Sequence, residues 1–504
     1  MIVVWFKKDL RIRDHEPLIV ASERGAAKFV YVYEDEQIKD PTYSPAKHGF
    51  LNESLVELDH SLRSLGACLS VLRGTLPGVF ADIHRKNPIT LLLSHQETGN
   101  DTSYKRDMRV KQWCKDQGVE WQEFTQTGVV RALKNRDGWS KQWNLRMNRA
   151  IFPAPQKLKS VDSPTQDSRA HLLSTKELGI EGLEQAGRQI GGEEYAFSVL
   201  NSFLSERGQK YSSEMSSPIT AENSCSRLSS YLAFGNISIK SVYQATRLKQ
   251  LEIKNSDPKP KYWGRSLAAF SGRLRWHCHF MQKLEDEPIL EHQNLNRGFD
   301  KLREEFDEEK FNAWRQGETG YPIIDACMKY LQQTGWINFR MRALLVSFSS
   351  YHLWLPWQRP AEYLAKLFVD FEPGIHYSQF QMQSGVTGIN AIRIYSPEKQ
   401  QTDQDPLGYF VKSQLPVLEP IPAEYLGNPA SMDLSVQNKL GVRIGFDYPD
   451  PIVDHKTAYS SAREKIYKWR AQPNVKEEAQ RVYKKHGSRK KTHWGKKNKT
   501  STPG

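Results

Sequence analysis

The change of hydrophobic pattern near residue 192 constrains the fold more than any other feature of this sequence. Before it, short β-branched segments alternate with stretches of helical periodicity, such as 46–65 and 104–117. The predicted strands are Ile2–Phe6, Lys28–Glu34, Cys68–Leu72, Ile89–Ser94 and Glu120–Phe124. Strands that alternate with helices are typical of a doubly wound parallel sheet. After residue 192 helical patterns dominate, as in Tyr195–Glu206, Ser266–Leu284 and Pro360–Val369, so we predict an α/β N-terminal domain followed by an all-α C-terminal domain.

The composition divides the chain further. We predict the α/β domain over 1–130, an interdomain linker over 131–192, the helical domain over 193–470 and a basic, disordered tail over 471–504. Periodicity is lost from Phe152 to Gly192, where Pro, Ser, Gln and Gly gather. The segment from Arg481 to Gly504 carries nine of the Lys and Arg residues, no acid, and much of the formal net charge of +13. It fits a sequence-independent phosphate binder or a solubilising tail, and charge alone does not separate the two.

Several classes of protein are disfavoured. The mean hydropathy is −0.65 and no apolar run is long enough to span a bilayer, so we expect no membrane association. The chain starts with a strand pattern and not with a signal peptide, and its five cysteines form no C-x-x-C pair. We therefore expect a cytoplasmic protein with reduced thiols and no zinc ribbon. His277 and His279 flank Cys278, but residues two apart on a helix point in different directions, so we expect no metal. No G-x-G-x-x-G follows the first strand, so the usual dinucleotide site is not supported.

Residues 313–328 and 334–342 (AWRQGETGYPIIDACM and TGWINFRMR) combine Trp, Gly, Arg and Asp in an ordered way. Alone, this block fits a core helix with Pro322 in its first turn. However, it resembles the flavin-binding domain of the photolyase/cryptochrome family, and three further segments match that family in the same order. They are 1–15 (MIVVWFKKDLRIRDH), 224–235 (SCSRLSSYLAFG) and 370–376 (DFEPGIH). The resemblance runs from Met1 to about Pro397.

The resemblance implies FAD as cofactor. A flavin dinucleotide needs hydrogen-bond donors for its pyrophosphate, a dry slot for its ring, and polar groups at the N1–N5 edge. The implied cofactor-binding residues are Tyr211, Cys225, Ser226, Arg227, Leu228, Ser229, Phe339, Arg342, Asp370, Glu372 and His376. Cys225 replaces the family's usual Thr, and His376 falls opposite the ring nitrogen N5, where an imidazole could donate a proton or tune the flavin. Without the family context, the same residues fit an N-capped helix, an ordinary ion pair and a core histidine.

Three implied residues carry the photochemistry: Trp276, Trp357 and His376. Relatives reduce the flavin through three tryptophans, and the corresponding positions here are Phe380, Trp357 and Glu304. Only the middle one is retained, so the usual hopping route is interrupted. Other Trp and Tyr side chains could form another route.

The implied substrate-binding residues are Trp276, Phe339, Arg340 and Met382. Trp276 matches an aromatic residue that stacks on an extruded lesion, although a core Trp would be the ordinary interpretation. Arg273 stands where photolyases that repair cyclobutane dimers place a Glu, and Met382 replaces a second stacking Trp. Phe339 and Ala343 stand where (6-4) photolyases place two His residues, so that specificity is not supported.

The resemblance favours a deoxyribodipyrimidine photolyase-like lyase that uses reduced FAD and light to split pyrimidine dimers. We expect UV-damaged DNA as its partner, a monomer, and an antenna chromophore, a folate or a deazaflavin, in the N-terminal domain. The alternative is a cryptochrome-like blue-light photoreceptor without repair activity, which the altered lesion pocket favours. A flavoprotein that does not use light is a third, more remote alternative.

Overall fold

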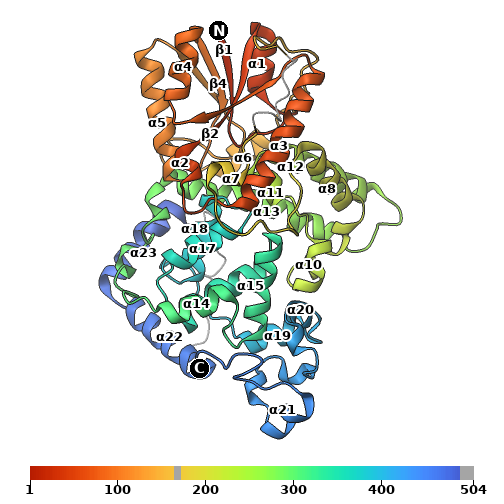
Figure 1. The fold of residues 1–504 in the computed structure, drawn as a ribbon, viewed down its shortest axis with the longest axis vertical. Helices are drawn as coiled ribbons and strands as arrows, with labels where there is room; N and C mark the ends of the chain where they lie inside the picture. Colours follow the sequence, from red (N-terminus) through yellow and green to blue (C-terminus); the bar gives the residue numbers. More distant parts are fainter. Residues whose placement is uncertain (164–171, 488–504) are drawn as a thin grey trace, which may run out of the picture.

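The N-terminal part of the chain folds around a parallel five-stranded sheet (Figure 1). The computed structural model describes residues 1–163 and 172–487. The strand order is β3-β2-β1-β4-β5, and the strands are β1 (Ile2–Phe6), β2 (Ala27–Glu34), β3 (Leu69–Gly74), β4 (Leu91–His95) and β5 (Glu120–Phe124). All five strands predicted from the sequence are confirmed, each within two residues at either end.

Both faces of the sheet are covered by helices, because β1 has apolar side chains on both of its faces. Val4 and Phe6 pack under α1 (Glu16–Arg24) and α3 (Pro45–Ser64). Val3 and Trp5 pack on the other face, with α4 (Gly78–Lys86) and α5 (Asp101–Asp116). Successive side chains of a strand point to opposite faces, so β1 is apolar on both. The sheet is therefore the buried middle layer of a doubly wound domain.

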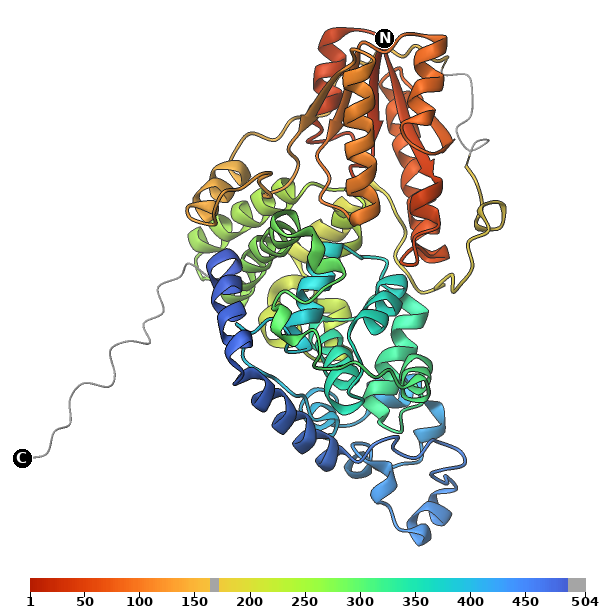
Figure 2. The same cartoon turned by 90° about the vertical axis from the view of Figure 1, so that its left-hand side faces the viewer.

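The rest of the described chain is helical and lies below the sheet domain in both views (Figures 1 and 2). Its helices of the first half are α8 (Glu193–Ser205), α9 (Tyr211–Glu214), α10 (Pro218–Ser224), α11 (Ser229–Ala233), α12 (Ile239–Asn255) and α13 (Trp263–Asp286). Those that follow are α14 (Glu308–Gln316), α15 (Pro322–Thr334), α16 (Phe339–Ser347), α17 (Gln358–Leu367), α18 (Pro373–Gln383), α19 (Pro397–Gln404), α20 (Tyr409–Gln414), α21 (Leu434–Leu440), α22 (His455–Arg470) and α23 (Pro473–His486). The prediction of an all-α second domain is confirmed, and no helix within the described residues is long and apolar enough to cross a bilayer.

The segment expected to be a linker contains two helices, α6 (Trp139–Met147) and α7 (Thr175–Leu178). Trp139, Trp143 and Met147 are buried in the same core as Phe270 of α13. These large apolar residues recur every four positions, which places them on one face of α6. The beginning of the linker segment is thus packed against the helical domain.

The prediction of disorder from residue 471 is wrong for α23. This helix buries Val475 and Val482, seven residues apart on one face, beneath a surface of charged residues. Figure 2 shows α22 and α23 running along the flank of the helical domain. The high charge of the segment hid a short amphipathic pattern, and the remaining predicted tail, 488–504, lies outside the described residues.

Candidate functional site

Arg342 and Asp370 form a two-pronged ion pair between α16 and the loop that joins α17 to α18. The Nη1–Oδ1 and Nη2–Oδ2 distances are 3.1 and 2.7 Å. Arg342 Nε also donates to the carbonyl of Ile337 at 2.8 Å, and its guanidinium lies 4.0 Å from the centre of the Phe368 ring. The Asp370 side chain is 3% exposed and that of Arg342 is 25% exposed. The ion pair therefore fixes the Arg342 guanidinium and leaves part of it accessible to a planar ligand.

Residues 225–229, the predicted phosphate-binding segment, form a tight loop between α10 and α11. Arg227 has a left-handed backbone (φ 59°), and its guanidinium lies 4.0 Å from the Trp336 ring. The loop is held by Arg207, which donates to the carbonyls of Asn223 and Cys225 at 2.9 and 2.7 Å. Arg207 could not be found from the sequence, because its contacts here are with backbone carbonyls and leave no motif.

Two buried polar atoms beside this loop have no hydrogen-bond partner within the described residues: Arg227 Nε and Asn338 Oδ1. In the part of the chain that the structure describes, Trp143 Nε1 and Trp314 Nε1 in the core also have no partner, so the two atoms beside the loop are compatible with a ligand but do not identify one by themselves. Leu228 is buried at the base of the loop, Ser226 Oγ accepts from its N–H at 3.5 Å, and Tyr211 is buried nearby in α9. The residue set fits the phosphate end of a dinucleotide.

Glu372 does not stand alone as an acid. Its Oε2 lies 2.6 Å from Nε2 of His277 on α13. Burial alone would lower the pKa of His277, but the charge of Glu372 and hydrogen bonds to Glu372 and Cys278 raise it to about 10. Glu372 and His277 therefore form an ion pair at neutral pH, and the sequence analysis missed this partner.

His376 is a neutral imidazole in this structure. Its ring packs against Phe368, Phe371, Tyr377 and Phe380, with centroids 5.2–6.0 Å apart. Burial lowers the pKa of His376 to about 3. Nε2 lies 2.8 Å from the carbonyl oxygen of Ala361, which can only accept, so Nε2 carries the proton. Nδ1 therefore carries no proton and accepts hydrogen bonds. In this state His376 can alter the electronic properties of a neighbouring group, but it cannot donate a proton to that group from Nδ1.

Phe380 and Trp357 follow His376 away from the Arg342–Asp370 pair. The Phe380 ring lies 5.4 Å from that of His376 and 6.4 Å from that of Trp357. Trp357 is buried and its Nε1 donates to Asn294 at 2.7 Å. Glu304, at the third position of the expected route, is exposed. The aromatic path is thus continuous as far as Trp357 and has a phenylalanine where an easily oxidised ring would be expected.

The four expected substrate-binding residues are all at least partly accessible. Trp276 is 52% exposed and Phe339 is 41% exposed. Arg340 and Met382 are half-buried. The guanidinium of Arg273, one turn before Trp276, lies 5.6 Å from the Phe339 ring, which brings the exposed faces of α13 and α16 together. The description of Trp276 as a core residue is wrong, because half of its side chain faces solvent.

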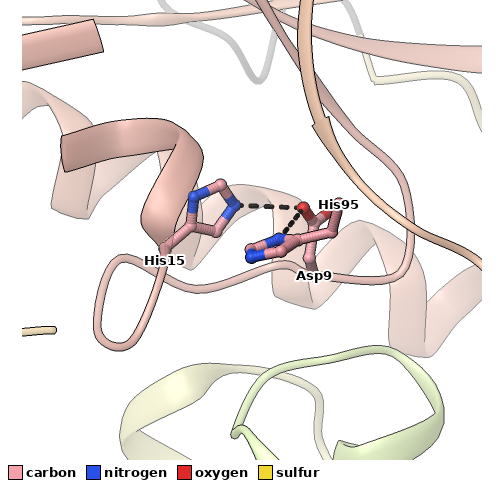
Figure 3. Close-up of side chains that lie close together, drawn as sticks. All are labelled: Asp9, His15 and His95. Carbon is pink, nitrogen blue, oxygen red and sulfur yellow. Dashed lines mark hydrogen bonds and ion pairs between the residues drawn. The ribbon is translucent and has the colours of Figure 1, made fainter. Parts of the chain in front are cut away.

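A buried Asp–His–His network lies in the sheet domain, and the sequence analysis missed it (Figure 3). Asp9 Oδ2 lies 3.1 Å from His15 Nε2 and 2.8 Å from His95 Nδ1. His15 Nδ1 accepts from the N–H of Leu18, which leaves Nε2 as the protonated nitrogen. The hydrogen bonds to Asp9 therefore tie the end of β1, the start of α1 and the end of β4 together. Asp9 and His15 lie in the segment that follows β1, and His95 ends the neighbouring strand β4, so their proximity becomes apparent only once the strand order is known.

A cavity of about 50 Å³ lies between the two domains. Gln96, Thr125 and Gln126, which follow β4 and β5, line it on one side, and His277 and Glu372 line it on the other. Open α/β sheets bind ligands at the carboxyl ends of their strands. This volume holds a few water molecules and not a pigment.

Two family models match the chain. One, DNA photolyase, covers residues 2–138, and the other, FAD binding domain of DNA photolyase, covers residues 270–468. Cryptochrome-2 of Arabidopsis thaliana is 29% identical over 90% of this chain and 77% of its own length. A deoxyribodipyrimidine photo-lyase of Alkalihalophilus pseudofirmus is 26% identical over 90% of this chain and 95% of its own. The structure of a bacterial class III photolyase from Agrobacterium tumefaciens superposes with a TM-score of 0.81 at 27% identity, covering 94% of this chain and 98% of that one.

Proposed function

Since the chain belongs to the photolyase/cryptochrome family and contains its FAD-binding domain, we propose that it is a light-driven DNA repair enzyme that splits UV-induced pyrimidine dimers. The proposal makes it a deoxyribodipyrimidine photolyase-like lyase whose substrate is UV-damaged DNA. When bound, reduced FAD supplies an electron after it absorbs near-UV or blue light, and the same electron returns once the dimer has split.

The residues of the helical domain have distinct parts in this proposal. Arg227 and the backbone of residues 225–229 hold the phosphates. Arg342, fixed by Asp370, would hold the flavin ring and would favour its anionic reduced form. His376, with its proton held on Nε2 by the carbonyl of Ala361, would offer Nδ1 as an acceptor to the cofactor. The antenna chromophore that we expect, a folate or a deazaflavin, would need a larger space than the present interdomain cavity.

The observation that carries the proposal is the exposure of Trp276. Trp276 is 52% exposed, whereas the other tryptophans in the described part of the chain are buried or half-buried. It projects from α13, the helix whose Arg273 lies 5.6 Å from the ring of the exposed Phe339 on α16, and α16 also carries Arg342. Exposed aromatic side chains on these two helices are suited to stacking on an extruded pyrimidine dimer.

A specific observation also favours a photoreceptor without repair activity. The exposed Arg273 stands on the face where dimer photolyases carry an acid, and Met382 replaces an aromatic residue. The relatives include both photolyases and cryptochromes. The two functions differ in one property that can be measured in the dark, because a repair enzyme must prefer a dimer over intact thymines.

The test is dark binding of two oligothymidines that differ by a single cyclobutane dimer. We expect the FAD-loaded protein to bind the damaged strand at least about tenfold more tightly. Replacing Trp276 with Ala should remove about 1–3 kcal/mol of binding free energy for the damaged strand only. Trp113 on α5, which lies in the sheet domain, is the matched control for replacement by Ala. Equal affinities for both strands in the wild type would favour the photoreceptor.

A further inference from the structure

A groove of about 500 Å³ opens between the first turns of α19 and α22, apart from the residues discussed above. Its lining includes Tyr395, Lys399, Gln400, His455, Lys456 and Tyr459. This volume is typical of sites for small organic ligands. We propose that the groove binds one nucleotide of a DNA strand, with the phosphate at the two lysines and the base against the tyrosines.

The charges at the groove suit a phosphate. α19 begins at Pro397 and α22 at His455, so the positive ends of two helix dipoles meet there. Lys456, in the first turn of α22, has no ion-pair partner among the described residues, and Lys399 shares only the exposed Asp403, at 3.5 Å. Of the other carboxylates at these two helix ends, Glu398 lies in the first turn of α19 and forms no ion pair with either lysine in the described structure, and Asp454 caps α22 by accepting from the N–H of Thr457 at 2.8 Å. Both ammonium groups therefore remain available to an anion.

A buried amide at the groove offers an acceptor to a hydrogen-bond donor on the ligand. The Gln400 side chain lines the groove, the residue is only 6% exposed, and its Oε1 has no partner within the described residues. A buried acceptor without a partner is costly, and a ligand can remove that cost. A phosphate alone has no donor for it at neutral pH, whereas a nucleobase offers ring N–H or amino groups.

The aromatic side chains that line the groove are held in place by neighbouring rings. Tyr459 lies 6.0 Å from His455, and the His455 ring stacks on that of His352 at 5.1 Å with an interplanar angle of 14°. His352 Nε2 and His455 Nδ1 are 2.9 Å apart, so a hydrogen bond fixes this stack. Tyr395 and Tyr459 are half-buried, with the remaining surface free for a base. Stacking on such rings tolerates any base sequence.

The groove adjoins the proposed lesion site. The Arg340 guanidinium lies 5.7 Å from the Tyr395 ring, and Arg340 follows the exposed Phe339 in α16. A strand that leaves Phe339 can therefore pass over Arg340 to reach Tyr395. This continuity favours a DNA strand over a free nucleotide, a choice that rests on the proposed function.

The test is dark binding of an undamaged, fluorescently labelled oligothymidine to the FAD-loaded protein over a range of salt concentrations. The double variant Lys399→Gln/Lys456→Gln should bind about tenfold more weakly, and its slope of log affinity against log salt should be shallower by roughly one. Gln400→Met should weaken binding without changing the slope. The control is Lys439→Gln/Lys468→Gln, which removes the same charge from exposed positions of α21 and α22 outside the groove. Its affinity should stay within twofold of the wild type.

Each outcome decides the matter. Unchanged affinity and slope in the groove variants, with intact FAD absorbance and Tm, would overturn the proposal. So would displacement of the oligonucleotide by thymidine 5′-monophosphate with equal affinity, since that would make the groove a free-nucleotide site. The proposed function fails separately: if light repairs dimers while the groove variants bind normally, the function stands and the groove proposal falls. If the groove variants lose binding while no dimer is repaired, the groove proposal stands and the proposed function falls.

Discussion

At the scale of single residues, the polar side chains of the site are neutralised in pairs. Arg342 pairs with Asp370, and His277 pairs with Glu372. The sequence predicted the first pair, because both residues lie in family motifs. It did not predict the second, because His277 and Glu372 are 95 positions apart and a lone histidine has no pattern of its own. Sequence motifs identify residues, and only the fold reveals which of them share a proton or a charge.

Replacing Asp370 with Asn should weaken FAD retention. The change keeps the shape of the side chain but leaves the Arg342 guanidinium without its counter-charge. The free energy of unfolding should fall by up to about 3 kcal/mol, below the usual cost for a fully buried pair because Arg342 is a quarter exposed. The measurement is the FAD-to-protein absorbance ratio together with Tm. Asp82→Asn breaks the exposed pair with Arg85 and is the matched control; equal effects of both changes would contradict this role for Asp370.

The His277–Glu372 pair makes stability depend on pH at the alkaline side. The folded protein holds the pKa of His277 at about 10, above its ordinary value of 6.5. The stabilisation is therefore complete below pH 6.5 and is lost as the pH rises through 10. Chemical denaturation at pH 7 and pH 10 should show a loss of a few kcal/mol that His277→Gln abolishes. An identical pH dependence in the variant would show that His277 is not charged in the folded protein.

At the scale of elements, local patterns predicted most of the secondary structure. Each strand begins within two residues of its predicted position because β-branched runs end sharply at turn residues. The helix α23 was missed because only Val475 and Val482 mark its buried face within a strongly charged segment. Its stability depends on a contact that the sequence cannot show: Glu287, at the end of α13, binds three of its side chains.

Replacing Glu287 with Gln should loosen α23. Glu287 lies 3.2 Å from Arg481 Nη1, 3.1 Å from Lys485 Nζ and 2.7 Å from His486 Nε2. Burial alone would raise the pKa of Glu287, but His486 and Lys485 lower it to about 2. The variant should speed hydrogen exchange of the α23 amides and lower Tm. Glu477→Gln, which removes a carboxylate from an exposed position of the same helix, is the control. Unchanged exchange in Glu287→Gln would mean that apolar packing alone holds the helix.

At the scale of the whole molecule, the sheet domain rests on the helical domain (Figure 2), and the cations are spread unevenly along the sequence. Six of them fall after His486: Arg489, Lys490, Lys491, Lys496, Lys497 and Lys499. The sequence predicted their charge, but it could not show that Arg481 and Lys485 are already committed to Glu287. A phosphate-binding tail is thus better defined as starting after α23.

Deleting residues 488–504 should therefore weaken DNA binding without disturbing α23 or FAD. Each lost phosphate contact should reduce the slope of log affinity against log salt by roughly 0.7–0.9. Salt-dependent binding to an undamaged duplex measures the effect, and the FAD absorbance spectrum is the internal control. If the truncated and full-length proteins have the same slope, the segment is a solubilising tail.

The central claim is that light and reduced FAD let this protein split pyrimidine dimers in DNA. The most direct measurement is to illuminate the FAD-loaded, reduced protein with an oligothymidine that contains one cyclobutane dimer, and to follow the return of thymine absorbance near 260 nm. We predict several turnovers per protein molecule in blue or near-UV light, none in the dark, and a large loss of rate in Trp276→Ala. Full FAD occupancy with no regain of thymine absorbance under illumination would contradict the claim and leave the photoreceptor as the better account.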